Sequence, residues 1–142
     1  MREAPGAMFD ISTDPGRIDR DLVHRFLSEE SYWARERPRA ATMTAIDHSL
    51  CFGAYEDGRM LAFGRAVTDR AVFGYLADVF VVAEARGRGL GKALVAAMVE
   101  HPDLQVASRL VLATYDAEGL YAQFGFVPLD DAQHWLQRRP AG

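Results

Sequence analysis

Three glycines at alternate positions, interspersed with two arginines, are the residues of this sequence best suited to bind an anion. They stand in Arg86-Gly87-Arg88-Gly89-Leu90-Gly91, between an apolar run and a segment whose apolar residues recur at helical spacing. A helix N-terminus presents free backbone N–H groups and the positive end of the helix dipole, and glycine lets several such groups approach one anion. The pattern predicts a phosphate or pyrophosphate site, to which the arginines add charge-assisted bonds. The residues expected to form it are Arg86, Gly87, Arg88, Gly89, Leu90, Gly91 and Lys92.

The spacing of the glycines excludes two common nucleotide-binding loops. A dinucleotide-binding fingerprint needs glycine where this chain has Lys92, and an acidic residue at the end of a second parallel strand about 20 positions further on. A Walker A loop needs glycine in place of Arg86 and a hydroxyl residue in place of Ala93. The structural alternative is a tight glycine-rich turn with solvated arginines, which leaves the arginines and the stability cost of three glycines unexplained.

The composition is that of an ordinary globular protein. Of its 142 residues, 49% are apolar and 25% charged, and the size predicts a single domain over residues 1–142. The net charge of −4 argues against nucleic acid as the partner. The single cysteine, Cys51, forms neither an internal disulfide nor a Cys-rich metal site, so we expect a buried thiol and no metal. No apolar run approaches the roughly 20 residues needed to cross a bilayer, so we expect a cytoplasmic protein without a membrane partner.

The elements that must position the loop alternate along the chain in an α/β pattern. Helical spacing or start signals predict helices from Pro15 to Glu29, from Pro38, from Leu90 to His101, and from Ala117 to Phe124. Apolar runs predict strands at Phe9 to Ser12, Leu50 to Tyr55, Met60 to Thr68, Val72 to Val82 and Leu110 to Thr114, with the last extended pieces at Phe126 to Leu129 and His134 to Gln137. Asp57-Gly58 is a hairpin signal. The result is a mixed α/β fold, mostly antiparallel, with one parallel strand-helix-strand crossover from Val79 to Leu112.

At the glycine loop the sequence resembles the GNAT N-acetyltransferases, whose acetyl-CoA signature reads Gln/Arg-x-x-Gly-x-Gly/Ala. A second block, Thr114 to Leu129, is similar to the family segment that ends in Leu-Tyr-x-x-x-Gly-Phe. The resemblance implies a GNAT-like fold, acetyl-CoA as cosubstrate, and two central strands that splay apart to admit the pantetheine arm. Many members have asparagine where this chain has Thr114, which puts one contact to that arm in question.

The resemblance also implies residue roles. Phe80 and Val81 match the strand whose backbone binds the pantetheine arm and polarises the thioester carbonyl. Tyr121 matches the general acid that protonates the departing thiolate after direct attack by an amine and a tetrahedral intermediate. From its neighbours alone, Tyr121 is better read as a core tyrosine packed against Phe124 and Phe126, and only the match to the family segment reverses that preference.

The proton acceptor and the acceptor pocket depend on less specific signals. Asp78 interrupts an apolar strand, so it is either a general base that faces a cleft or a carboxylate paired with Arg65 on the neighbouring strand. We expect Glu29, Tyr32 and Trp33 to line the acceptor pocket, where acidic and aromatic side chains suit an ammonium group. The alternative is an aromatic pair that covers the core beside a solvated charge cluster. Three nearby arginines would repel a simple polyamine or bind the 3′-phosphate of CoA: Arg35, Arg37 and Arg39.

Three classes of function follow. The favoured one is an acetyl-CoA-dependent N-acetyltransferase for a primary amine on a small molecule or a protein, and by resemblance it could assemble as a homodimer. The second is a non-catalytic acyl-CoA-binding module, which would keep the glycine loop but need no Tyr121. The third is an interaction domain whose glycine loop binds another phosphate-bearing partner.

Overall fold

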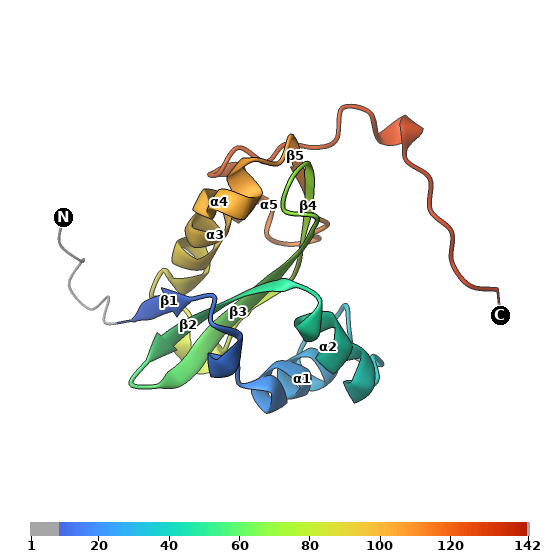
Figure 1. The fold of residues 1–142 in the computed structure, drawn as a ribbon. Coiled ribbons are helices and arrows are strands. Elements are labelled where there is room, and N and C mark those ends of the chain that lie inside the picture. Colours follow the sequence, from blue (N-terminus) through green and yellow to red (C-terminus); the bar gives the residue numbers. More distant parts are fainter. Residues whose placement is uncertain (1–8, 142) are drawn as a thin grey trace.

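A five-stranded sheet forms the centre of the computed structural model, which describes residues 9–141 (Figure 1). The strand order is β1-β2-β3-β4-β5; the first three pairings are antiparallel and β4 pairs with β5 in parallel. The predicted mixed fold with one parallel crossover is therefore confirmed. The strands are β1 Asp10–Ser12, β2 Leu50–Glu56, β3 Arg59–Thr68, β4 Phe73–Val81 and β5 Arg109–Val111.

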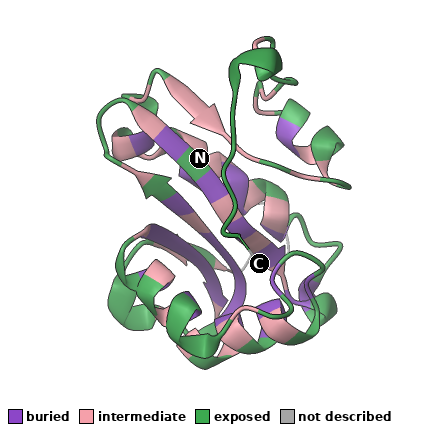
Figure 2. Ribbon diagram, turned by 90° about the vertical axis from the view of Figure 1, so that its right-hand side faces the viewer, coloured by how far each residue is buried: buried purple, intermediate pink, exposed green. Residues whose placement is uncertain are grey.

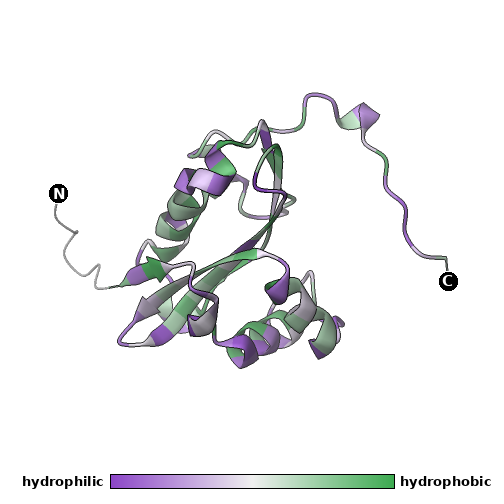
Figure 3. Cartoon of the chain, in the orientation of Figure 1, coloured by the Kyte–Doolittle hydropathy of each residue, from purple (hydrophilic) through white to green (hydrophobic). Residues whose placement is uncertain are grey.

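The helices cover both faces of this sheet. On β4, Phe80 points to one face and stacks on Phe26 of α1, with ring centroids 4.0 Å apart. On the other face, α3 packs so closely that a Cβ on Gly64 would lie 3.0 Å from the sulfur of Met98. Figure 3 shows the apolar strands between these helices. The helices are α1 Arg20–Glu29, α2 Arg39–Asp47, α3 Leu90–Glu100, α4 Pro102–Gln105 and α5 Glu118–Ala122.

The first helix begins later than its start signal suggested. Asp14 and Pro15 open a single 3-10 turn, Pro15–Arg17, in which the Asp14 carboxylate accepts a hydrogen bond from the Gly16 N–H at 2.9 Å. The chain then returns to an extended conformation at Ile18, and Asp19 caps α1 by accepting from the Leu22 N–H at 3.0 Å. Two aspartates thus compete as caps, and the second one starts the helix.

The hairpin signal at Asp57-Gly58 is confirmed. Both residues have positive φ, 52° and 79°, as a tight turn between twisted strands requires, and the flanking residues Glu56 and Arg59 pair directly. The β3–β4 turn is fixed differently, by the Asp69 carboxylate, which accepts hydrogen bonds from three successive backbone N–H groups. Both turns hold β2, β3 and β4 in register.

The parallel pairing of β4 and β5 is short. It comprises only the pairs Phe73–Arg109, Gly74–Leu110 and Tyr75–Val111, whereas β4 continues to Val81. The predicted strand from Leu110 to Thr114 therefore ends early, because the chain turns away from β4 after Val111. Gly74 allows the close approach where the strands do meet, since a Cβ there would lie 2.7 Å from Leu110 Cδ2. Beyond Tyr75 the two strands splay apart as expected.

The segment after α5 differs from its prediction. Within the described residues no strand follows β5, so the extended pieces at Phe126 to Leu129 and His134 to Gln137 do not join the sheet, and His134 ends a 3-10 turn, Ala132–His134. The segment leads away from the sheet and is exposed over most of its length, although Phe126 still packs against the core (Figures 1 and 2). Polar contacts tether it: Asp131 pairs with Arg109 of β5 at 2.6 Å, and the Arg109 guanidinium lies 4.8 Å from the Trp135 ring centre.

The core lies between α3, the sheet and α1. Cys51 is buried in it as predicted, and burial raises the pKa of its thiol to about 11, which makes it unreactive. No helix of residues 9–141 combines the length and apolar character needed to span a membrane.

Replacing Leu94 on α3 with alanine tests this core. Leu94 is completely buried, so Leu94→Ala should lower the free energy of unfolding by about 2–5 kcal/mol through lost contacts and a residual cavity. The same change at Leu136, whose side chain is 94% exposed, should alter it by less than about 0.5 kcal/mol. Urea unfolding of both variants measures the difference, and equal losses would contradict the placement of α3 and of the C-terminal segment.

Candidate active site

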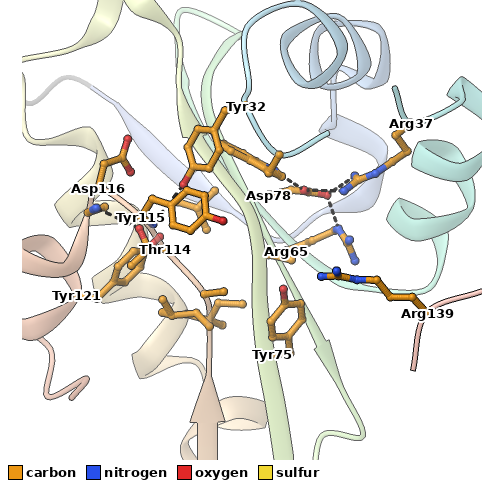
Figure 4. A pocket seen from close by; sticks show the side chains of 17 residues that line it. Tyr32, Arg37, Arg65, Tyr75, Asp78, Thr114, Tyr115, Asp116, Tyr121 and Arg139 are labelled. Atoms are coloured by element: carbon orange, nitrogen blue, oxygen red, sulfur yellow. Dashed lines mark hydrogen bonds and ion pairs between the residues drawn. The ribbon is translucent and has the colours of Figure 1, made fainter. Parts of the chain in front are cut away.

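A cavity of about 550 Å³ lies where β4 and β5 separate (Figure 4). Its walls come from the middle of β4, the segment 112–117 after β5, α5, and the connection between α1 and α2. Arg139 of the C-terminal segment also reaches it. The splayed strands thus produce the opening that the family resemblance requires.

Some of the predicted site residues line this cavity, whereas those of the glycine loop lie outside it. Five of them line it: Tyr32, Trp33, Asp78, Thr114 and Tyr121. Glu29 does not, because it is the exposed last residue of α1. Phe80 lies outside the cavity with its ring buried against Phe26, and Val81 ends β4 beside α3. Sequence reasoning missed Tyr75, Tyr115, Asp116 and Arg139 as lining residues.

The glycine loop leads directly into α3. Gly87 and Gly89 have φ of 83° and 79°, which L side chains rarely adopt, and Gly89 is the N-cap residue of the helix. No side chain of the described residues caps this N-terminus. Gly91 lies in the first helical turn, where a Cβ would come 3.6 Å from Val81. An uncapped helix start at the end of β4, with no side chain over it, fits a bound anion.

The two arginines of the loop have different partners. Arg88 forms a two-pronged pair with Glu56 at the end of β2, with N···O distances of 3.1 and 2.5 Å. Arg86 donates from Nε to the carbonyl of Val81 at 3.2 Å. Glu56 was not anticipated from the sequence, because only the hairpin brings it next to the loop. Arg88 therefore joins the loop to the β2–β3 turn.

Asp78 is the most constrained residue of the site. It is 6% exposed and has a φ of 54°, because Asp78 and Val79 together oppose only Gly64 in a β-bulge between β4 and β3. Its carboxylate accepts hydrogen bonds from three side chains: Trp33 Nε1 at 2.9 Å, Arg37 at 2.7 and 3.2 Å, and Arg65 Nε at 2.8 Å. The pairing with Arg65, one of the two alternatives, is present in the structure.

This environment argues against Asp78 as the general base. Burial alone would raise the pKa of Asp78, but the hydrogen bonds from Arg37 and Arg65 outweigh it, so the pKa lies below its usual value of 3.8. An ionised carboxylate that already accepts from three donors is a weak base. Asp78 instead fixes the arginines and Trp33 around the cavity.

Tyr121 and Thr114 stand on the opposite wall (Figure 4). Burial, followed by the proximity of Tyr32 and Asp116, raises the pKa of Tyr121, so the phenol is protonated at neutral pH and suited to donate a proton. Its ring also packs edge-to-face on Phe126, with centroids 5.8 Å apart. Thr114 Oγ1 accepts from the Ala117 N–H at 3.0 Å, so this hydroxyl braces the turn that leads into α5.

Replacing Asp78 with asparagine tests the cluster. Asp78→Asn leaves two guanidinium groups without a counter-charge and should cost on the order of 3 kcal/mol of unfolding free energy at pH 7. Because the folded pKa is lowered, the carboxylate contributes stability above its usual pKa and loses that contribution as the pH falls through the lowered value, so the difference from the parent should shrink in acid.

Asp47→Asn provides the matched control for that experiment. Asp47 pairs with Arg20 at 2.7 Å, but the two side chains are 57% and 35% exposed, so its loss should cost less than about 1 kcal/mol. Urea unfolding of both variants across pH 3 to 8 measures the two effects. A loss at Asp78 no larger than at Asp47 would contradict the cluster.

Comparison with known proteins places this geometry in a family. The model described as "Acetyltransferase (GNAT) family" matches residues 20–126. A crystal structure from Xanthomonas campestris pv. campestris, of a protein described as belonging to the GNAT family, is 50% identical, has a TM-score of 0.90 and shares 93% coverage of both chains.

Two curated sequences are also similar. A Gibberella zeae protein described as an acetyltransferase is 29% identical over 136 residues, which cover 80% of this chain and 75% of that protein. Glucosamine 6-phosphate N-acetyltransferase 1 of Oryza sativa subsp. japonica is 35% identical over 111 residues, which cover 71% of this chain and 65% of that protein. Because the family match spans α1, the glycine loop and the Tyr121 block, this chain belongs to the GNAT family of acetyltransferases.

Proposed function

We propose that this acetyltransferase moves the acetyl group of acetyl-CoA to a primary amine by direct attack. The observation that carries the proposal is the separation of β4 and β5, which opens a cavity with Tyr121 on its wall. The uncapped N-terminus of α3 lies outside this cavity, beside Val81 at the end of β4. Acetyl-CoA supplies the activated thioester. The relative that acetylates glucosamine 6-phosphate supports an amine as acceptor.

The glycine loop is the proposed site for the pyrophosphate of CoA. A Cβ at Gly87 or Gly89 would meet nothing within 4 Å, so the backbone N–H groups around them are accessible to a ligand. The first turn of α3 adds Leu90, Gly91 and Lys92, and the helix dipole favours the anion. Of the two loop arginines, Arg86 lies at the end of β4, whereas Arg88 is held by Glu56 and steadies the loop.

The free edge of β4 is the proposed site for the pantetheine arm. Beyond Tyr75 this edge has no strand neighbour among the described residues, so backbone groups there can bond an extended ligand. We assign this role to the backbone of Phe80 and Val81, where an N–H group would polarise the thioester carbonyl. Thr114 faces the same cavity, but its hydroxyl is used within the chain.

Tyr121 is the proposed proton donor. The amine nitrogen forms a bond to the carbonyl carbon, the carbon–sulfur bond of the tetrahedral intermediate breaks, and Tyr121 protonates the departing thiolate and then regains a proton from solvent. The proton lost by the amine passes to solvent, since Asp78 is held by its three donors. A non-catalytic acyl-CoA-binding module would use the loop but not this phenol.

Binding at the loop can be tested with two equivalent glycine substitutions. Gly87→Val and Gly58→Val each place a branched side chain at a φ near 80° in open space, so both should lower the melting temperature by a similar amount. Saturating acetyl-CoA should raise the melting temperature of the parent and of Gly58→Val, but much less that of Gly87→Val, because only Gly87 lies in the proposed site. If acetyl-CoA and CoA stabilise none of the proteins, both CoA-dependent functions fail.

The role of Tyr121 can be tested by removing its hydroxyl. Tyr121→Phe should lower kcat for CoA release by about 100-fold or more while the acetyl-CoA Kd stays unchanged. Tyr55→Phe is the control, since its buried hydroxyl has no partner among the described residues and should leave kcat unaltered. A panel of amino acids, amino sugars and lysine peptides supplies the acceptors. An unchanged kcat in Tyr121→Phe would remove the general-acid role.

A further inference from the structure

One wall of the cavity carries more positive than negative charge. Arg37 and Arg65 share a single carboxylate, that of Asp78, and Arg139 reaches the same side (Figure 4). Arg139 has no hydrogen bond or ion pair with any of residues 9–141. Three arginines against one aspartate leave a formal charge of 3 − 1 = +2 on this wall.

These arginines are partly removed from water. The side chains of Arg65 and Arg37 are 13% and 25% exposed, and Trp33 and Tyr75 lie beside them. Arg65 uses Nε for Asp78 and Nη1 for the Ser49 hydroxyl at 3.1 Å, which leaves Nη2 without a partner in the described part of the chain. Guanidinium groups in such a place favour an anion that accepts paired hydrogen bonds, which is the chemistry of a carboxylate or a phosphate.

The opposite wall has the other sign. Asp116 lies there with Tyr121 and Thr114, and it has no cationic partner among the described residues that line the cavity (Figure 4). Its negative charge contributes to the raised pKa of Tyr121, which places it within electrostatic reach of the phenol. A carboxylate beside the proposed proton donor attracts the ammonium form of an incoming amine.

We infer that the acceptor is a small molecule with both a primary amine and an anionic group, the amine directed to the Tyr121 and Asp116 wall and the carboxylate or phosphate to Arg65 and Arg139. This inference rests on the proposed transfer to an amine and specifies its substrate class. A cavity of about 550 Å³ accommodates a molecule of that kind. The arginine wall disfavours polyamines and lysine side chains, so the ammonium selectivity expected around Glu29 is replaced by recognition of a molecule with both charges.

Matched acceptor pairs test the inference. Glucosamine 6-phosphate is compared with glucosamine, and L-glutamate with L-glutamic acid diamide, which has the amine but neither carboxylate, so that the phosphate and carboxylate sources are separate arms. The anionic member of at least one pair should have a kcat/KM at least about 10-fold higher, as expected for one charge-assisted bond. Equal or better activity with glucosamine, the diamide, spermidine or lysine peptides, none of which offers the proposed pairing of an amine with a recognised anionic group, would overturn the inference while leaving N-acetyl transfer intact.

Two adjacent arginines provide the matched variants. Arg139→Ala should raise KM for the preferred anionic acceptor about 10-fold with little change in kcat, and should not affect its neutral partner. Arg138→Ala removes the same charge from a residue that does not line the cavity, so its KM should equal that of the parent. If both variants raised KM equally, the effect would come from the general surface charge and not from a specific contact of Arg139, which would overturn the proposal.

A binding measurement separates this inference from the proposed function. With CoA saturating, so that phosphates cannot use the glycine loop, glucose 6-phosphate and glutarate are titrated at constant ionic strength and the melting temperature is followed. Stabilisation by one of them that Arg139→Ala weakens supports the anion site even if no amine is acetylated. No stabilisation by either probe would count against it, whatever the outcome of the acetyl-transfer assays.

Discussion

One buried carboxylate connects the segment between α1 and α2 to the sheet. Asp78 lies in the bulge of β4 and is bonded at the same time by Arg65 of β3 and by Arg37 and Trp33 from the connection between α1 and α2. Without the bulge, the strand would place this position in ordinary antiparallel register and point its side chain elsewhere. This cluster therefore fixes the connection between α1 and α2 to the middle of the sheet, beside the stacking of Phe26 on Phe80.

The second constraint is the early end of the parallel pairing. Because β5 contacts β4 at only three positions, the middle of β4 borders a cavity instead of a strand. Tyr121, on the segment that leaves β5, lies on the wall of this cavity, and the first turn of α3 lies beside Val81 at the end of the same strand. Tight packing between Gly74 and Leu110 fixes where the separation begins.

Local signals in the sequence predicted the parts of this arrangement that local physics controls. The Asp57-Gly58 turn, the glycine loop and the α3 helix each depend on residues close in sequence, and all three lie where expected. Four side chains that the sequence assigned to the donor and acceptor sites line the same cavity, and their roles stay predictions: Tyr32, Trp33, Thr114 and Tyr121. Asp78 was recognised as unusual, and Arg65 as its possible partner, from an isolated charge in an apolar strand.

What the sequence did not reveal depends on contacts between distant segments. Arg37 and Arg139 belong to charge-rich stretches whose members look alike until the chain is folded. The extended pieces after Phe126 contain apolar residues at strand-like intervals, but a strand also needs a neighbour, and the chain leaves the sheet before one is available. Asp19, and not Asp14, caps α1, because the 3-10 turn that Asp14 begins ends at the extended residue Ile18.

The two arginines paired with Asp78 contribute both to the stability of the fold and to the charge of the cavity. Arg37 and Arg65 share the carboxylate of Asp78, so a substitution at either one changes the charge of the cavity wall and removes a buried ion pair at the same time. Arg139 is different, because it lies in an exposed segment outside the core and its replacement removes no buried contact. A substitution at Arg139 therefore changes the charge of the cavity wall without removing a contact from the core.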